Sequence, residues 1–196
     1  LLHLGNYAAK AFDLSYDYII NSNEKVAEKG HKTEEAINTI DEKLTRYLIS
    51  LSGEALSQKE SEVLTNILDS SRDLERIGDH AEALINLNDY LQRKNVQFSE
   101  AALEELAEIY HKTSEFVKDA LESVENNDFK KAQALIERHE DINNMERVLR
   151  KTHIKRLNNG ECSTQAGVNF IDIISHYTRV SDHAMNLAEK VLAEQI

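Results

Sequence analysis

Hydrophobic residues recur along this chain at alternating steps of three and four, with polar and charged residues between them. The spacing is clearest over residues 63–91 and 170–191, and it is typical of the buried stripe of a helix in a bundle. The two stripes consist of Val63, Ile67, Leu74, Ile77, Ala81, Leu84 and Leu91, and of Phe170, Ile173, Tyr177, Val180, Ala184, Leu187 and Val191. A helix of about 33 residues is about 50 Å long, so the pattern predicts an elongated bundle.

Helix start and stop signals divide the chain into six segments. Ser57 and Glu60 have the spacing of a capping box, and Ser163 is a further N-cap candidate. Gly53 and Gly160 stand where the glycine that ends a helix is expected. The predicted helical segments are 1–21, 24–52, 57–94, 99–126, 128–158 and 163–195.

The composition supports a fold made only of helices. The 196 residues include no proline, no tryptophan and 6 glycines, and aromatic residues make up 6% of the chain. Proline interrupts helices, and sheet-rich folds need more turn residues and more aromatic and β-branched side chains than this. We therefore predict an all-α fold of six long helices.

An internal repeat divides the predicted helices into two groups of three. At an offset of 105 residues, Asn21, Ala27, Glu35, Ile37, Asn38 and Leu44 recur as Asn126, Ala132, Glu140, Ile142, Asn143 and Leu149. At an offset of 103 residues, Arg76, Asp79, His80 and Ala81 recur as Arg179, Asp182, His183 and Ala184. The repeat predicts two three-helix bundles, residues 1–94 and 99–195, related by a pseudo-twofold axis.

The charge and the cysteine content restrict the function classes. With 35 acidic and 23 basic residues the formal charge is −12, which argues against a nucleic-acid or anionic-lipid surface and favours metal cations or basic partners. Cys162 is the single cysteine, so an internal disulfide framework is excluded, and the acid beside it in the sequence does not activate a thiol. The chain does not begin with methionine, and we expect it to be part of a longer polypeptide.

Paired acids are the strongest candidates for chemistry. Glu75 and Asp79 lie one helical turn apart, and Glu82 lies on the same stripe, which we expect to face outward from the core. Carboxylates at this spacing repel each other by a few tenths of a kcal/mol unless a hard cation binds between them. The alternative is a solvated helix face on which Arg72 and Arg76 supply the counter-charge.

Two histidines and two Glu-x-x-His pairs complete the candidates. His80 and His183 are repeat-related, and each either orients a metal ligand or packs against a neighbouring helix. A buried di-metal oxidase site needs Glu-x-x-His pairs that project inward. Residues 28–31 and 108–111 have that spacing, but Glu108 and His111 lie outside the buried stripe predicted for their segment. No nucleophile motif is present either, so we predict that the chain is not an enzyme.

Residues 73–81, DLERIGDHA, and residues 178–184, TRVSDHA, resemble the repeated acidic motif of the PhoU family. The resemblance covers nearly the whole chain and implies two tandem three-helix bundles that regulate phosphate transport. Residues 142–162 are most similar to the PhoU-type domain at the C-terminus of bacterial sodium–phosphate cotransporters. This implies a regulatory domain on the cytoplasmic face of the membrane, docked on the membrane portion of a phosphate transporter or on a second copy of itself. The alternative is a free-standing cytoplasmic PhoU regulator that acts on an ABC phosphate transporter and its sensor kinase.

The resemblance also implies a metal site, with departures. Family members with surface metal clusters carry the acidic pair in both halves, and here Glu75 and Asp79 are intact while Thr178 replaces the second acid and leaves Asp182. Asn38 and Asn143 stand where the family often has acids. We expect Glu75, Asp79 and Asp182 to be the ligands of a divalent or iron cation, with the first half the better site.

Overall fold

The computed structural model describes residues 1–53 and 55–193, and within these ranges it contains six α-helices and no strand. The helices are α1 (Leu2–Asn21), α2 (Glu24–Ser52), α3 (Gln58–Arg93), α4 (Glu100–Asn126), α5 (Phe129–Asn158) and α6 (Thr164–Leu192). The all-α prediction is confirmed, and the predicted boundaries of the first five segments lie within one residue of the observed ones. The last two residues predicted for the sixth segment lie outside the described ranges.

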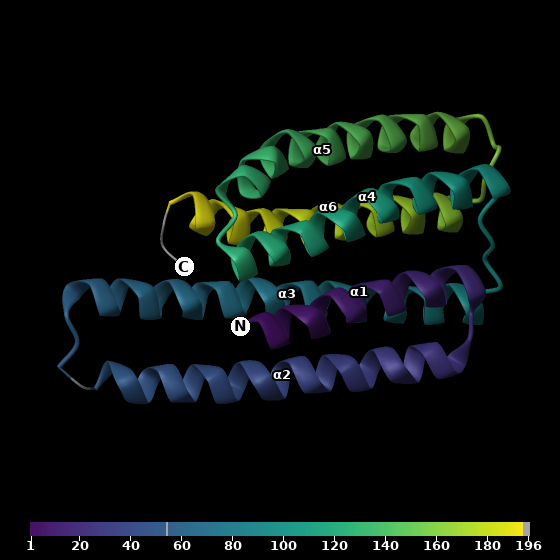
Figure 1. Ribbon diagram of the computed structural model, residues 1–196. Helices are drawn as coiled ribbons and strands as arrows, with labels where there is room; N and C mark the ends of the chain where they lie inside the picture. Colours follow the sequence, from purple (N-terminus) through teal and green to yellow (C-terminus); the bar gives the residue numbers. More distant parts are fainter. Residues whose placement is uncertain (54, 194–196) are drawn as a thin grey trace.

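The helices form two three-helix bundles that lie one on the other, and we call each bundle a layer (Figure 1). In one layer α1 packs against α2 and α3, and in the other α4 packs against α5 and α6. The layers meet where α3 contacts α6 and α1 contacts α4. Residues that are about 100 positions apart in the sequence therefore lie side by side along the α3–α6 contact.

Side-chain caps fix the helix ends. The Ser57–Glu60 capping box is present, because the Ser57 hydroxyl accepts from the Glu60 N–H at 3.3 Å and the Glu60 carboxylate accepts from the Ser57 N–H at 2.8 Å. The Ser163 hydroxyl caps α6 by accepting a hydrogen bond from the Ala166 N–H at 3.1 Å. Gly160 adopts a φ of 72° in the α5–α6 turn, a conformation that other residues rarely adopt.

The hydrophobic core is continuous across the two layers. Phe12 of α1, Phe116 of α4 and Tyr177 of α6 are fully buried in one cluster, and the rings of Phe12 and Tyr177 meet edge to face at 5.4 Å. Leu74, Ile77, Ala81 and Leu84 of the α3 stripe and all seven residues of the α6 stripe belong to this buried cluster. Their burial therefore stabilises each layer and the contact between the layers.

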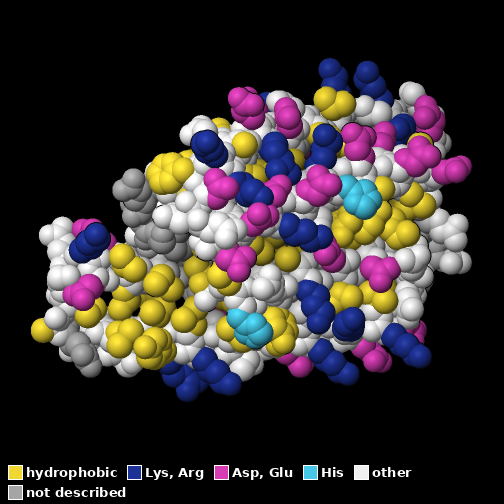
Figure 2. Space-filling model, in the orientation of Figure 1, with side chains coloured by type: hydrophobic (Ala, Val, Ile, Leu, Met, Phe, Trp, Pro, Cys, Tyr) yellow, Lys and Arg dark blue, Asp and Glu magenta, His cyan; other side chains and the backbone are white. Residues whose placement is uncertain are grey.

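One end of the predicted α3 stripe is not buried. Val63 is 39% exposed, because α3 has 36 residues and α1 only 20, so the α2–α3 hairpin extends beyond the start of α1 (Figure 1). Figure 2 shows hydrophobic side chains gathered on this extension. The heptad pattern predicted the helix correctly but could not predict which part of it another helix covers.

A glycine allows α2 and α3 to approach each other closely. A Cβ atom on Gly78 would lie 2.9 Å from Cδ1 of Ile37, a fully buried residue of α2. Gly78 directly precedes Asp79, so this close approach lies next to the acids of α3.

Candidate functional site

The acids predicted on α3 face helix α2. The side chains of Glu75 and Asp79 are 26% and 35% exposed, so they are half-buried and do not form the solvated outward face that the sequence predicted. Glu34 and Asp41 of α2 lie close enough to interact electrostatically with Glu75. We call Glu34, Asp41, Glu75, Asp79 and Glu82 the acidic seam, which runs along the α2–α3 contact.

Like charges crowd one another in the acidic seam. Glu34 is only 8% exposed, and burial together with the charges of Glu82 and Asp79 raises its pKa. Burial and the charge of Asp79 raise the pKa of Glu75, although Arg76 opposes the shift. Both shifts mean that the charged form of each carboxylate is less stable in the folded protein than in water.

The basic side chains beside the acidic seam pair with only some of its carboxylates. Arg76 contacts Asp79 at 3.0 Å and Glu75 at 3.8 Å, and His31 lies 3.4 Å from Glu82. The Oδ1 atom of Asp41 is buried and has no hydrogen-bond partner among the described residues. A buried carboxylate oxygen without a partner is costly, and a bound cation would supply the missing interaction.

The seam is rich in oxygen donors, which suits hard cations such as Mg²⁺, Mn²⁺ and Ca²⁺. The fit is partial, however. Over residues 1–53 and 55–193 no three His, Cys, Asp or Glu side chains converge in a geometry that could hold a metal ion. The donor chemistry and the orphaned Asp41 oxygen fit a cation, and the side-chain positions would have to adjust to bind it.

In the second half, other residue types occupy the equivalent positions, and Asp182 contacts a histidine there. His139 of α5 replaces Glu34, and its Nε2 lies 2.9 Å from Oδ1 of Asp182. Thr178 replaces Glu75, and its hydroxyl donates to the carbonyl of Ile174 at 3.0 Å. The structure therefore brings Glu75 and Asp79 together but places Asp182 apart from them, in the other layer. The sequence analysis missed His139, although the repeat offset of 105 makes it the equivalent of Glu34 in the second half.

The two predicted histidines lie at the α3–α6 contact, between the layers. Nδ1 of His183 lies 3.0 Å from Oδ1 of Asp73, and Nδ1 of His80 lies 3.0 Å from Nδ1 of His176. Burial, followed by the charges of His176 and His183, lowers the pKa of His80 to about 4. The sequence analysis missed Asp73 and His176, which are themselves related by the repeat offset of 103. Both histidines make interlayer contacts, and neither contacts the acidic seam in any hydrogen bond or ion pair that we observe.

None of the six helices, as far as the structure describes them, has a stretch both long and apolar enough to cross a bilayer. Six long helices in two three-helix layers with a shared core define this protein as a tandem helical-bundle domain.

Comparison with known proteins gives the family. The model of the PhoU domain matches residues 1–87 and 106–191, so the chain belongs to the PhoU domain family. A protein of Thermotoga maritima named phosphate-specific transport system accessory protein PhoU homolog 1 is 29% identical over 178 residues, which are 91% of this chain and 68% of the relative. The corresponding PhoU homolog of Clostridium acetobutylicum is 21% identical over 196 residues, 98% of this chain and 87% of the relative.

Two solved structures share the fold. The crystal structure of PhoU from Pseudomonas aeruginosa superposes with a TM-score of 0.89 at 18% identity, over 100% of this chain and 94% of that one. The crystal structure of the phosphate transport system regulatory protein PhoU from Streptococcus pneumoniae superposes with a TM-score of 0.85 at 21% identity. The superposition covers 100% of this chain and 93% of that one. At these identities the likeness establishes the fold.

Proposed function

We propose that this chain is a PhoU-type accessory regulator of phosphate transport that acts by binding and has no catalytic activity. The observation that carries the proposal is the match of the PhoU domain to both halves of the chain. Both curated relatives are named as accessory proteins of a phosphate-specific transport system, which supports a regulatory role. The acidic seam and the interlayer histidines offer charged and polar groups that a partner or a cation could bind.

Of the two modes of action expected from the sequence, the comparisons favour the regulator that works as a separate protein in the cytoplasm. The relatives are accessory proteins, and their names mention no cotransporter. The sodium–phosphate cotransporter tail, expected from residues 142–162, stays a prediction from the sequence. The partner in the favoured mode is the membrane portion of a phosphate transport system, bound by a separate chain.

This interaction can be tested by crosslinking in cells. A tagged copy of the chain would be crosslinked with formaldehyde in its own organism, and the attached proteins identified by mass spectrometry. We expect subunits of a phosphate transport system to be enriched over a tagged helical protein of similar size and charge. Equal recovery with both proteins would overturn the proposal.

We also propose that the acidic seam binds a divalent cation when one is available. The residues that would hold it are Glu34, Asp41, Glu75 and Asp79, and the cation would offset the repulsion between their carboxylates. Asp182 is not part of this proposal, because it lies in the other layer, where Thr178 and His139 stand at the positions of Glu75 and Glu34.

The cation proposal is tested by thermal unfolding with and without Mn²⁺. A ligand that binds only the folded state raises Tm, so we expect Mn²⁺ to raise the Tm of the unmodified chain and of Asp182→Asn. Asp79→Asn should lose most of that increase. An equal response to Mn²⁺ in Asp79→Asn and Asp182→Asn would contradict a site at the seam.

A further inference from the structure

Helix α5 presents one side to its layer and leaves the other side uncovered. Within the described ranges it contacts α4 and α6 and no other helix, and it runs along the outside of the molecule (Figure 1). From Gln133 to Asn158, every residue at alternating steps of four and three is exposed. Residues at these steps lie along one line of a helix, and we call this line the outer stripe of α5.

Large hydrophobic side chains are exposed along the edge of the outer stripe. Phe129, Ile136 and Ile154 are each 42% exposed. Ile136 follows Phe129 by seven residues, which is about two helical turns, and Ile154 follows Ile136 by 18 residues, which is about five turns. The three side chains therefore lie on the same side of the helix. A surface helix usually keeps such residues for the side that it buries, so this line is typical of a helix with a second contact.

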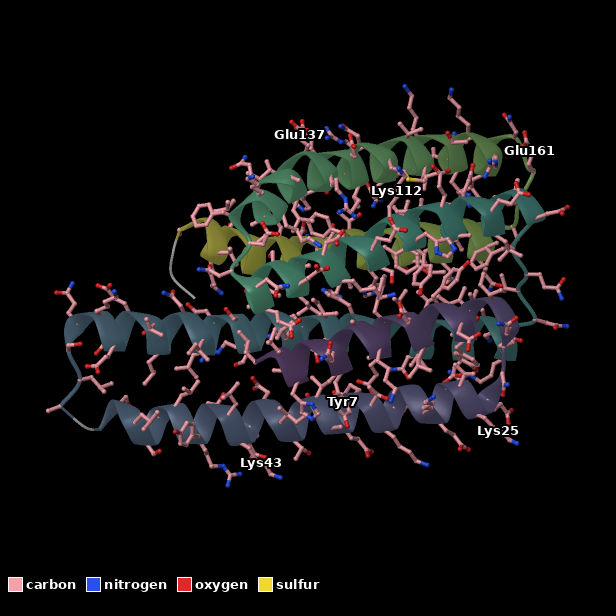
Figure 3. All side chains as sticks on the ribbon, in the orientation of Figure 1. Tyr7, Lys25, Lys43, Lys112, Glu137 and Glu161 are labelled. Carbon is pink, nitrogen blue, oxygen red and sulfur yellow. The ribbon has the colours of Figure 1, made fainter. Side chains whose placement is uncertain are left out.

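Charges along the outer stripe are separated by sign. Glu137 and Glu140 lie in its N-terminal half, and Figure 3 shows Glu137 pointing away from the bundle. Residues 147–158 include five basic residues and no acid, and Lys and Arg side chains project from the upper edge of the molecule over α5 (Figure 2). Lys151 and Lys155 are exposed in this half. Neither glutamate and neither lysine makes a side-chain hydrogen bond or an ion pair with another described residue, so these charges are available to a partner.

An antiparallel contact between two copies of α5 would match these features. Helices that pack antiparallel about a twofold axis bring together residues whose numbers add to nearly the same value. The numbers of Ile136 and Ile154 add to 290, and those of Glu140 and Lys151 add to 291. One alignment therefore sets isoleucine against isoleucine and acid against base, and the twofold axis makes each contact twice. A parallel contact would instead place like charges opposite each other.

We propose that the outer stripe of α5 is a self-association surface, on which α5 of a second copy packs antiparallel about a twofold axis. A twofold interface uses the same patch on both copies, so the patch must be complementary to itself, and the outer stripe meets this requirement through its separated charges. Helix α5 has 30 residues and is about 45 Å long. A contact along one helix is small for a specific interface, so we expect a dissociation constant on the order of 10–100 µM. Because part of the attraction is between exposed charges, added salt weakens it.

Sedimentation velocity of the full chain tests the self-association, in a reducing buffer so that Cys162 cannot link two copies. Between about 5 and about 500 µM protein, we expect the average mass to rise from the 22.3 kDa of one chain toward that of a dimer. A chain that stays monomeric over this range overturns the proposal. That result would leave the role in phosphate transport unaffected, because self-association is measured without a transport system.

Charge reversal on the outer stripe tests the alignment. Lys151→Glu and Glu140→Lys each place like charges against each other in a symmetric pair, so we expect each variant alone to associate at least about tenfold more weakly. A mixture of the two variants sets acid against base again, so we expect it to form mixed dimers with nearly the original affinity. Lys43→Glu is the control, because Lys43, labelled in Figure 3, is an exposed residue of α2 and its reversal changes the same charge away from α5.

Three results would contradict the α5 interface. Undiminished association of both single variants would place the contact on another surface, such as the exposed hydrophobic tip of the α2–α3 hairpin. Equal weakening by Lys43→Glu and Lys151→Glu would show that net charge controls association. Failure of the mixed variants to associate would rule out the antiparallel alignment. All three substituted residues are exposed, and circular dichroism should confirm that each variant remains helical.

Discussion

His183 and Asp73 join the two layers of the molecule, with Nδ1 of the histidine 3.0 Å from Oδ1 of the aspartate. The repeat relates this contact to that between His80 and His176, because Asp73 and His176 are equivalent positions in the two halves. The same interlayer contact is thus made twice, once as a histidine–carboxylate pair and once as a histidine–histidine pair. Only the first can carry an ion-pair interaction.

Replacing Asp73 with Asn should weaken the α3–α6 contact. The Asp73 side chain is 14% exposed and accepts hydrogen bonds from His183 and Asn186 at 3.0 and 2.8 Å, with Lys190 at 3.4 Å. The variant leaves the Lys190 charge without its partner, so we expect the free energy of unfolding to fall by about 2 kcal/mol. Urea denaturation at pH 7 measures the change. Asp69→Asn is the control, because Asp69 is half exposed and lies 3.8 Å from Arg72, and it should change stability by less than about 0.5 kcal/mol.

The His80–His176 contact should make stability depend on pH. The pKa of His80 is lowered to about 4 from its ordinary 6.5, so the unfolded chain takes up this proton first as the pH falls. The free energy of unfolding should therefore decrease between pH 6.5 and 4. The raised pKa values of Glu34 and Glu75 act in the opposite direction, since the folded chain takes up those protons first.

Comparison with His80→Asn isolates the contribution of His80, because the two glutamates are the same in both chains. Between pH 7 and 5 the wild type should lose about 1 kcal/mol more than the variant, after allowance for solvent screening of the partly exposed ring. Urea midpoints at the two pH values give the difference. Parallel pH profiles for the two chains would contradict the assignment.

Replacing Gly78 with Ala should push α2 and α3 apart. The added Cβ would lie 2.9 Å from Cδ1 and 3.2 Å from Cγ2 of Ile37, which is fully buried. We expect a loss of about 1–2 kcal/mol, since overpacking exceeds the gain in helix propensity. Ile37→Val removes Cδ1, so the double variant should cost less than the sum of the two single variants. Additive losses would mean that the two side chains do not meet.

Removing one charge from the acidic seam should stabilise the protein when no divalent cation is present. Glu34→Gln keeps the shape of a side chain that is 8% exposed and removes its repulsion with Glu82 and Asp79. We expect a gain of about 0.5–1 kcal/mol in the free energy of unfolding with EDTA present, and a smaller gain in high salt. Glu35→Gln, at the exposed neighbouring position, should leave stability nearly unchanged. A loss of stability in Glu34→Gln would contradict crowding of like charges in the seam.

Local signals in the sequence predicted the helices well. The Ser57–Glu60 capping box and the N-cap Ser163 gave helix starts that the structure confirms, because capping depends on residues within one turn. The exposure of Val63 could not be predicted in this way. It depends on the lengths of α1 and α3 after they pack, and heptad spacing contains no information on that.

The candidate site was predicted only in part for a similar reason. Glu75 and Asp79 are one turn apart and could be paired from the sequence, but the proximity of Glu75 to Asp41 and of Asp79 to Glu34 depends on how α2 and α3 are aligned. By contrast, His139 could have been predicted from the repeat, since residues at equivalent positions occupy equivalent places in the two halves.

The central claim is that this chain regulates phosphate transport, and phosphate uptake is its most direct test. The gene would be deleted in its own organism, and uptake of radiolabelled phosphate measured before and after transfer from phosphate-poor to phosphate-rich medium. We expect the deletion to abolish the adjustment of uptake to external phosphate and a plasmid copy of the gene to restore it. Uptake that adjusts normally in the deletion strain would contradict the claim.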